Sequence, residues 1–519
     1  MVASNGARAD EPDTSAPPGI MPTAMTLTQL IARTTEAVGR VQTGVPHTRR
    51  EQWKITFGSL NGSRAYLESG PDFRNEQTLG PARTAEGRSA GKTWRMNANE
   101  QVSVGSNLHR EDDVDAAALH SNARGGAAII GQVSTPVDSY VVRVDPQGGR
   151  FEYRFYDRKT FLLDRIEEIR DGRRGTIVFS DYRTTKGLTE PWHVHTSDGF
   201  TTNDGDEVLQ SLAIGGAVAP SELSVPPNGA PIISLTGSPT NVPIVMSSDV
   251  IVVPVRMGGH KVDFILDSGA DGIVIDKGVV EALKIPEYGR ITSETAGTYV
   301  ESDIVIPAML VGDLSLQNVH ARSLPFTQWT DTGTPVAGLL GYDFIHDVVW
   351  HIDYMKGTLE AIAPNSFVPP PGAHAFSVTF DDNVPTVVAA IGGAPAPAFI
   401  LDTGADRSII FSRFADAHPQ QIVDLGLGTQ MRASFPFVNK FSGVGGAVES
   451  RPIQAGPLAL GPWTFPKWLF QVTQDAASFE FEDYDGLLGQ DLLRNFDVYL
   501  DYPHSKVYLL PNERFRQRW

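Results

Sequence analysis

The sequence contains no cysteine among its 519 residues. Disulfide bonds, zinc–thiolate sites and thiol nucleophiles are therefore excluded, and any catalysis must use other groups. Basic residues are also scarce, because 43 Lys and Arg stand against 61 Asp and Glu, for a formal net charge of −18. No basic cluster is present, so binding to nucleic acid or to an anionic membrane surface is not expected.

Long apolar runs are missing as well. None reaches the roughly 18 to 20 residues that a membrane span needs, so no transmembrane segment is expected. The start of the chain, MVASNGARADEPDTSAPPG, has no apolar core flanked by basic residues and is not a signal peptide. It resembles the disordered lead of a mature exported chain, so residues 1–24 are predicted to be disordered and the protein to be periplasmic or secreted.

Glycine (50) and proline (36) are abundant and favour many short strands. One helix is predicted at 26–40, because apolar residues recur there at helical spacing behind a Thr that can cap it. These residues are Leu27, Leu30, Ile31 and Val38. Short alternating segments then run to about residue 215, which predicts an antiparallel β half-barrel; the first domain is placed at 25–216.

The rest of the chain is divided by two stretches rich in Pro and Gly. Residues 217–245 read as an extended linker that wraps a domain edge, and 365–374 as a shorter linker. They delimit two segments of similar size, 246–364 and 375–515. One contains FILDSGAD from residue 264, and the other FILDTGAD from residue 399.

Further landmarks repeat between these two segments. The Asp motifs are offset by 402 − 267 = 135 residues, whereas three later pairs are offset by 148. These pairs are Gly297–Ser302 with Gly445–Ser450, Gly338–Gly341 with Gly486–Gly489, and Asp353–Tyr354 with Asp501–Tyr502. One net insertion of 148 − 135 = 13 residues in the second copy aligns all four landmarks, so the segments are predicted to form two equivalent lobes.

Each copy of the motif ends an apolar strand at an Asp, followed by a small hydroxyl residue and a Gly that permits a sharp turn. The hydroxyls of Ser268 and Thr403 and the backbone N–H groups of the turns can satisfy the two carboxylates. If a pseudo-twofold axis brings the turns together, Asp267 and Asp402 cannot both ionise easily and share a proton. Such a pair can hold a water and carry out general acid–base hydrolysis of an amide.

At this point Leu266-Asp-Ser-Gly-Ala270 and Leu401-Asp-Thr-Gly-Ala405 resemble the active-site motif of aspartic peptidases, especially the retropepsin-like group. The resemblance covers about residues 246–515. It implies that Asp267 and Asp402 are catalytic and that the turns formed with Ser268, Gly269, Thr403 and Gly404 support them. Retroviral members carry one lobe in each chain, so this chain is interpreted as a fused, single-chain form.

The resemblance also implies an apolar-apolar-Gly element behind each turn, which is expected to be structural, and a glycine-bearing flap over the substrate. The first element matches Leu339, Leu340, Gly341 and Leu487, Leu488, Gly489. The flap candidates are Gly297, Thr298, Tyr299 and Gly443, Gly445, Gly446. Tyr299 is expected to cover the carboxylate pair from a flap tip. The 13 additional residues, placed near 412–444, are expected to alter the second flap.

The first domain carries a resemblance of its own. FEYRFYD at 151, FSDYR at 179 and GLTEP at 187 resemble the incomplete barrel of periplasmic lipoprotein-carrier-like domains. This resemblance implies a concave apolar face over a helix, able to hold a lipid chain or a peptide segment, and a location outside the cytoplasm.

Other acidic and histidine residues have simpler interpretations. The spacing after Asp267 does not fit a calcium loop, because Gly269 and Gly278 occupy ligand positions. Asp271 and Asp406 are expected at the surface or at a contact between lobes. His193 and His195 are expected on one face of a strand, but a third metal ligand is not evident, so no metal site is predicted.

The sequence therefore predicts a mainly β protein, in which a half-barrel domain with a helix precedes two aspartic-protease-like lobes. Its predicted function is that of an aspartic endopeptidase without a cofactor, acting on a peptide or protein. Because one chain supplies both Asp residues, a monomer is expected. The alternative is an inactive binding protein of the same fold, whose first domain holds a lipid or peptide; the intact Asp motifs argue against it.

Overall fold

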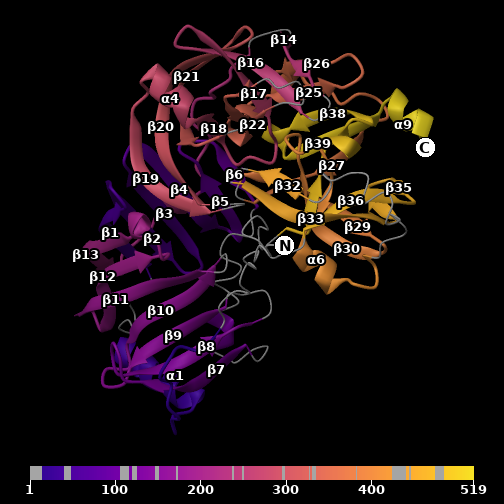
Figure 1. The fold of residues 1–519 in the computed structure, drawn as a ribbon. Helices are drawn as coiled ribbons and strands as arrows, with labels where there is room; N and C mark the ends of the chain where they lie inside the picture. Colours follow the sequence, from indigo (N-terminus) through magenta and orange to yellow (C-terminus); the bar gives the residue numbers. More distant parts are fainter. Residues whose placement is uncertain are drawn as a thin grey trace, which may run out of the picture. The chain divides into compact units, whose positions relative to one another are not determined.

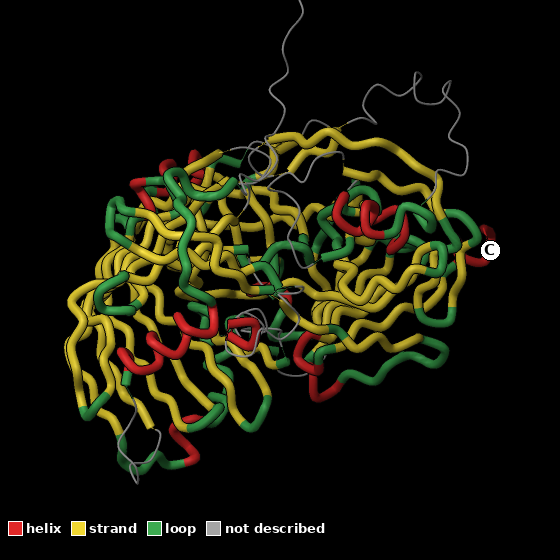
Figure 2. Tube along the Cα trace, turned by 90° about the horizontal axis from the view of Figure 1, so that it is seen from below, coloured by secondary structure: helices red, strands yellow, loops and turns green. Residues whose placement is uncertain are grey.

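The computed structural model describes residues 15–39, 48–105, 116–119, 126–146, 151–170, 173–235, 239–247, 250–294, 298–326, 328–329, 335–381, 383–422, 440–443, 446–473 and 484–518. Strands predominate and the helices are short (Figure 2). The chain divides into two compact units. The first, the half-barrel unit, comprises Met1–Asn97, Asn107–Pro227 and Gly289–Thr292. The second, the bilobal unit, comprises Ala98–Ser106, Asn228–Tyr288 and Ser293–Trp519.

The half-barrel unit is built on one wide antiparallel sheet (Figure 1). The order of its strands is β5-β4-β3-β2-β1-β13-β12-β11-β10-β9-β8-β7, so two meanders meet where β13 returns to β1. The strands are β1 (Thr48–Phe57), β2 (Leu60–Ser69), β3 (Asp72–Leu79), β4 (Ala82–Ser89), β5 (Lys92–Met96), β7 (Ala127–Val133), β8 (Ser139–Val144), β9 (Glu152–Asp157), β10 (Leu163–Arg170), β11 (Arg173–Thr185), β12 (Leu188–Ser197) and β13 (Gly205–Ile214).

One amphipathic helix, α1 (Leu27–Val38), packs on this sheet as predicted. Thr26 caps it in a reciprocal capping box with Gln29, which satisfies backbone N–H groups at the helix start. Leu30 is fully buried among apolar residues of β7, β8 and β9, including Val142 and Tyr156. The helix therefore buries its apolar side against one end of the sheet.

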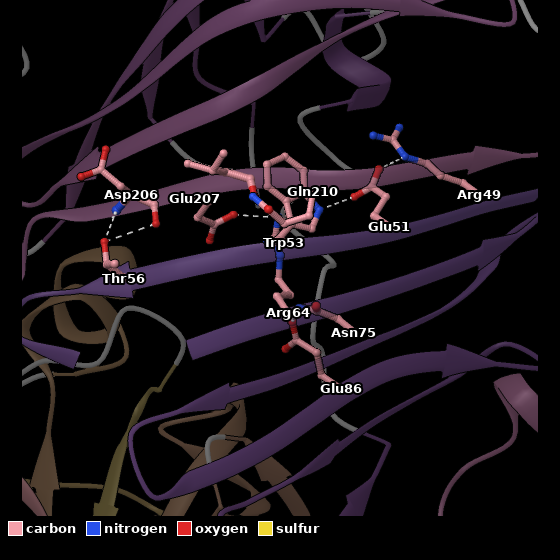
Figure 3. A network of polar contacts seen from close by, with 11 residues as sticks. Arg49, Glu51, Trp53, Thr56, Arg64, Asn75, Glu86, Asp206, Glu207 and Gln210 are labelled. Atoms are coloured by element: carbon pink, nitrogen blue, oxygen red, sulfur yellow. Dashed lines mark hydrogen bonds and ion pairs between the residues drawn. The ribbon is translucent and has the colours of Figure 1, made fainter. Parts of the chain in front are cut away.

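The middle of the sheet combines an apolar cluster that contains Trp53, Ile55 and Leu209 with charged side chains. Trp53 is buried there, yet Arg64 stacks over its ring at 4.7 Å and pairs with Glu207 at 2.6 Å (Figure 3). Glu51 accepts a hydrogen bond from Trp53 Nε1 at 2.7 Å. The side chains of Arg64 and Glu207 are each 24% exposed, and burial raises the pKa of Glu207. Charged groups thus lie beside apolar residues in the middle of this sheet.

Two segments that were expected to be irregular take part in sheets. Residues 1–14 of the predicted disordered lead lie outside the described residues, but Met21 exchanges two backbone hydrogen bonds with Gln132. Within 217–245, α3 (Pro220–Leu223) forms and β14 (Thr240–Val242) pairs with β26 (Thr358–Ile362). Backbone pairing thus attaches part of each segment to the folded units.

The bilobal unit contains two sheets of related topology and a third that the lobes share. The lobe 1 sheet has β15 (Val245–Met246), β16 (Ile251–Met257), β17 (His260–Leu266), β18 (Ile273–Asp276), β19 (Glu287–Glu294), β20 (Thr298–Val311), β21 (Leu314–Leu324) and β24 (Gly338–Leu340). The lobe 2 sheet has β28 (Thr379–Asp381), β29 (Val384–Ile391), β30 (Ala394–Leu401), β31 (Ile409–Ile410), β32 (Lys440–Gly443), β33 (Gly446–Ala455), β34 (Leu458–Leu460), β35 (Trp463–Phe465), β36 (Trp468–Thr473) and β37 (Gly486–Leu488).

The shared sheet joins the lobes. Its order is β14-β26-β25-β38-β39-β27, made of β25 (Val349–Asp353), β26 (Thr358–Ile362), β27 (His374–Ser377), β38 (Phe496–Asp501), β39 (Lys506–Pro511) and β14. Short strands β6 (Val102–Val104), β22 (Gln328–Trp329) and β23 (Pro335–Val336) and helices α4 (Lys277–Leu283), α5 (Tyr342–Ile345), α6 (Ser412–Ala417), α8 (Gln490–Leu493) and α9 (Glu513–Arg518) complete the bilobal unit. One apolar core runs through both lobes.

Strand pairing confirms that the lobes are equivalent. In lobe 1, β17 pairs with β24 in parallel and β18 pairs with β21 in parallel; in lobe 2, β30 pairs with β37 and β31 with β36 in the same way. In the shared sheet, His351 lies opposite Tyr499, its own counterpart at 351 + 148 = 499, and their rings stack at 4.2 Å. The pseudo-twofold axis therefore passes between β25 and β38, and the predicted mainly β fold class is confirmed.

Candidate active site

The two Asp motifs occupy the same place in each lobe. β17 ends at Leu266, and the N–H of Asp267 donates to Leu340 O at 3.0 Å. β30 ends at Leu401, and the N–H of Asp402 donates to Leu488 O at 3.0 Å. Each Asp thus follows a buried strand whose last residue pairs in parallel with the Leu-Leu-Gly strand.

Hydrogen bonds cross between the two turns. Ser268 N donates to Thr403 Oγ1 at 3.0 Å, and Thr403 N donates to Ser268 Oγ at 2.9 Å. Each hydroxyl in turn donates to the carbonyl that precedes the opposite Asp: Ser268 Oγ to Leu401 O at 2.7 Å and Thr403 Oγ1 to Leu266 O at 2.8 Å. The two turns therefore form one hydrogen-bonded unit.

This unit brings the two carboxyl groups together. A Cβ built on Gly269 would lie 2.7 Å from Asp402 Cγ, and one built on Gly404 would overlap the Asp267 carboxyl group. Each carboxyl group therefore lies directly against the glycine of the opposite turn. Only a residue without a side chain permits this approach, which explains the Gly of both motifs.

The two carboxyl groups differ electrostatically. Asp402 Oδ1 accepts hydrogen bonds from Gly404 N at 2.7 Å and Ala405 N at 3.1 Å. Burial raises the pKa of both groups, but for Asp402 these N–H donors and a hydrogen bond from Asp267 act against the rise. The charge of Asp402 raises the pKa of Asp267 further. The pair therefore shares one proton, and these differences favour its location on Asp267.

The Leu-Leu-Gly elements lie directly beneath the turns. Tyr342 N, after Gly341, donates to Ala270 O at 3.0 Å, and Gln490 N, after Gly489, donates to Ala405 O at 2.8 Å. Leu340 and Leu488 are fully buried in the shared core, whereas Leu339 and Leu487 face two smaller apolar clusters. The elements thus fix the turns from below.

Two buried carboxyl groups escaped the sequence analysis. Asp343 and Asp491 occupy equivalent positions, since 343 + 148 = 491, and burial raises the pKa of each to about 6. Asp343 accepts from Ile273 N at 3.1 Å, and Asp491 accepts from Ser408 Oγ at 2.8 Å. The repeat offset was the available signal, because an Asp at the same position in both copies follows each Leu-Leu-Gly.

Asp271 and Asp406, which follow the turns, form ion pairs of different kinds. Asp271 pairs closely with Arg322 of β21, whereas Asp406 pairs with the adjacent Arg407 at 2.9 Å. Asp271 O also accepts from Asn383 of the other lobe at 3.3 Å. The two sides of the site are therefore not chemically identical.

The flap candidates are partly described. Thr298 and Tyr299 begin β20, and Tyr299 packs against the apolar cluster that contains Leu339. Gly443 and Gly446 pair across the hairpin of β32 and β33. Gly297 and Gly445 lie outside the described residues, as does most of the segment that holds the 13 additional residues.

His193 and His195 share one partner in the half-barrel unit. His193 Nε2 lies 2.8 Å and His195 Nδ1 3.1 Å from Asp206 Oδ1. Within the described part of the chain, no group of three or more His, Asp or Glu side chains is arranged to hold a metal ion. The described helices likewise include none that is long and apolar enough to cross a membrane.

Comparison with known proteins agrees with the geometry of lobe 1. Residues 253–344 match the family described as aspartyl protease. This range contains Asp267 and the Leu339–Gly341 element. The resemblance of this part of the chain to aspartyl proteases is therefore confirmed. No curated protein matches this chain significantly.

Several solved structures are similar in part. An aspartic proteinase from Irpex lacteus is 12% identical, with a TM-score of 0.33, and the match covers 53% of this chain and 98% of that one. A putative outer membrane lipoprotein-sorting protein domain from Vibrio parahaemolyticus is 11% identical, with a TM-score of 0.28, covering 38% of this chain and 94% of that one. A LolA superfamily protein from Nitrosomonas europaea is 12% identical, with a TM-score of 0.28, covering 39% and 98%.

Proposed function

We propose that this protein is an aspartic endopeptidase that hydrolyses peptide bonds with a water held between Asp267 and Asp402. The observation that carries the proposal is the reciprocal hydrogen bonding of Ser268 and Thr403, which joins the two turns and sets one carboxyl group against the other. A pair that shares one proton offers an acid and a base at a single point, as amide hydrolysis requires.

The protonation of the pair assigns the steps. Ionised Asp402 takes a proton from the water, whose oxygen attacks the carbonyl carbon, while Asp267 donates its proton to the carbonyl oxygen. In the resulting tetrahedral diol, Asp402 passes the proton to the amide nitrogen and Asp267 takes one back from a hydroxyl group. The C–N bond then breaks, releasing an acid and an amine, and the pair returns to its initial state.

The apolar clusters beside the turns favour a peptide substrate with apolar side chains next to the scissile bond. Ile265, Val274 and Leu339 belong to a cluster in lobe 1, and Ile400, Ile409 and Leu487 to its equivalent in lobe 2. Each cluster adjoins one catalytic turn, through Ala270 in lobe 1 and Ala405 in lobe 2. We therefore expect apolar side chains on both sides of the scissile bond.

The half-barrel unit is proposed to modulate access or localisation, outside the cytoplasm, and no cofactor is required. In the middle of its sheet, Arg64 and Glu207 form a partly buried ion pair beside the apolar residues Trp53, Ile55 and Leu209. A polar or peptide-like ligand is compatible with such groups because they can form hydrogen bonds.

Single substitutions test the proposal. Asp267→Asn and Asp402→Asn should each lower cleavage of an unstructured protein by about 10²–10⁴-fold, the usual contribution of acid–base catalysis. Asp313→Asn, in the exposed turn after β20, is the matched control and should cleave normally. A statine-type inhibitor, which mimics the tetrahedral intermediate, should block the wild type. Equal cleavage by all variants would remove the carboxyl pair from the mechanism, and no cleavage by the wild type would favour the binding-protein alternative.

A further inference from the structure

The two buried carboxyl groups behind the turns are held by different parts of the chain. In lobe 2, Asp491 accepts from Ser408 Oγ at 2.8 Å and from Trp468 Nε1 at 3.1 Å. Ser408 Oγ also accepts from Gly489 N at 3.3 Å. Lobe 2 therefore fixes its buried carboxyl group with side chains of its own strands.

Lobe 1 lacks the hydroxyl donor. The residue equivalent to Ser408 is Ile273, since 408 − 135 = 273. The Ile273 side chain cannot donate a hydrogen bond. From this position, Asp343 thus receives only the backbone N–H of Ile273.

A segment from elsewhere in the sequence supplies the missing donor. Residues 98–106 lie between β5 and β7 in sequence but belong to the bilobal unit. The side chain of Asn99 hydrogen bonds to the Asp343 carboxylate. It also binds one peptide group of β21, since its Nδ2 donates to His320 O at 3.0 Å and its Oδ1 accepts from His320 N at 2.8 Å.

Neighbouring contacts hold this segment firmly. Gln101 is 3% exposed and donates through Nε2 to the backbone O of Asp343 at 2.9 Å. Val102 N donates to Asn228 Oδ1 at 2.6 Å, and Gly229 N donates to Glu100 O at 2.8 Å. Asn99 thus precedes three residues that hydrogen bonds hold in place, and its own amide is held by the His320 peptide group.

Asp343 in turn holds the end of the catalytic turn. Its Oδ2 accepts from Ile273 N, and a Cβ built on Gly272 would lie 2.7 Å from the same atom. Tyr342, next to it, donates its N–H to Ala270 O. A displacement of Asp343 would therefore be transmitted to residues 270–273, three to six positions after Asp267.

We propose that Asn99 is a positioning residue for the Asp267 turn, replacing in lobe 1 the donor that Ser408 supplies in lobe 2. The inference rests on the proposed function for its catalytic consequence. It makes the segment 98–106 a part of the peptidase unit, although its sequence lies within the half-barrel region. The two lobes have equivalent folds. Lobe 2 supplies the side-chain donors to its buried carboxyl group itself, whereas lobe 1 receives one from the segment 98–106.

A conservative substitution tests this role in the full chain. Asn99→Leu should lower kcat about tenfold with little change in KM, since the loss of one hydrogen bond to a charged group misplaces the turn without altering the surface that binds substrate. Adding Ile273→Ser, which installs the lobe 2 donor, should restore most of kcat. Asn75→Leu, which removes the hydrogen bond from Asn75 Nδ2 to Glu86 in the half-barrel sheet, is the matched control and should leave kcat unchanged. Normal kcat in Asn99→Leu, or failure of the added Ile273→Ser to restore kcat, would overturn the proposal.

Hydrogen exchange separates this proposal from the proposed function, because it needs no activity. In Asn99→Leu, backbone amides of 264–276 should exchange faster than in the wild type, while those of the equivalent segment 399–411 should not change. Unchanged exchange in 264–276 would overturn the positioning role even in an active enzyme. Faster exchange confined to 264–276 in an inactive protein would support the role and count against the peptidase.

If Asn99→Leu does not fold, Asn99→Asp provides the test. It keeps the acceptor for His320 N but places a second carboxyl group beside Asp343, which also faces Asp271 and Arg322. The new charge should raise the pKa of Asp343, so amide exchange in 264–276 should become faster than in the wild type as the pH rises above about 6. The same exchange as the wild type at pH 5 and pH 8 would overturn the proposal.

Discussion

Ser268 and Thr403 donate their backbone N–H groups to each other's hydroxyl oxygens, at 3.0 and 2.9 Å. The two residues are 1% and 0% exposed, so water cannot replace either bond. They are equivalent residues of the two lobes, since 403 − 268 = 135, which is the offset of the Asp motifs. The pseudo-twofold axis therefore passes between them, as it passes between His351 and Tyr499 in the shared sheet.

Removing one hydroxyl should weaken the joint between the lobes. Thr403→Val keeps the shape of the side chain but leaves Ser268 N and Leu266 O buried without that partner. Each unsatisfied buried group costs about 1–3 kcal/mol, so we expect a lower melting temperature and a lower kcat. Thr464→Val, at an exposed position of β35, is the control for the same chemical change. Unchanged melting and unchanged kcat in Thr403→Val would show that the crossed bonds do not hold the site.

A methyl group on the Gly of either turn should displace the opposite carboxyl group. In Gly404→Ala the new Cβ would overlap the Asp267 carboxyl group, and in Gly269→Ala it would lie 2.7 Å from Asp402 Cγ. We expect both variants to lose peptidase activity by about 10²-fold or more, because small displacements at a reacting centre are costly. Gly175→Ala, in β11 with its nearest neighbour at 3.2 Å, should remain active. Peptide cleavage rates measured on the three variants test this prediction. Rates for Gly404→Ala and Gly269→Ala equal to that of Gly175→Ala would contradict it.

Local sequence patterns predicted the parts of the site that repeat. The Asp267 and Asp402 turns could be found because apolar strand, Asp, hydroxyl and Gly occur together twice, and the helix at Leu27–Val38 because periodicity and a cap coincide. Both signals lie within a few consecutive residues. The residues that form the turn or the helix are therefore the same residues that carry the sequence pattern, and the pattern is enough to predict the local structure.

Contacts between distant segments could not be predicted in this way. Asn99 lies 168 positions before Asp267, outside both copies of the repeat, and a single Asn carries no periodicity. The charged pairs around Trp53 were also missed, because alternation shows which residues share a face but not that Arg64 and Glu207 neutralise each other there. The lobe asymmetry at Ile273 and Ser408 became interpretable only once Asp343 and Asp491 were located.

The carboxyl pair should make stability depend on pH. The folded pKa of Asp267 lies above its ordinary value of 3.8, so the folded state binds this proton more tightly than the unfolded chain does. The corresponding stabilisation is complete below pH 3.8 and is lost as the pH rises through the folded pKa. Asp267→Asn removes this titration. The melting temperature of the variant minus that of the wild type should therefore increase from pH 4 to pH 8. A constant difference across this range, measured by thermal unfolding, would contradict the raised pKa.

Activity should follow the same pair. Because one carboxyl group must be ionised and the other protonated, kcat/KM should show a bell-shaped dependence on pH, with limbs that belong to the pair as a whole. The acidic limb marks protonation of the charge that the pair carries, and the basic limb marks loss of the proton that it shares. Rates with a neutral peptide between pH 3 and pH 9 test this. A flat profile would be incompatible with a shared proton.

Cleavage should prefer apolar residues on both sides of the scissile bond. Leu339 and Leu487 belong to the two apolar clusters beside the turns. Removing an apolar contact of one large side chain costs about 1.5–3 kcal/mol, so a peptide with Leu-Phe at the cleavage site should be hydrolysed at least tenfold faster than one with Asp or Lys at either position. Substituting Tyr299→Asn, a flap candidate that packs on the lobe 1 cluster, should narrow this preference on one side of the bond only, whereas Leu469→Asn, at an exposed position of β36, should leave it unchanged. Mass-spectrometric mapping of products from a mixed peptide library measures the preference on each side of the bond independently. Equal cleavage of charged and apolar peptides would show that these clusters do not contact substrate.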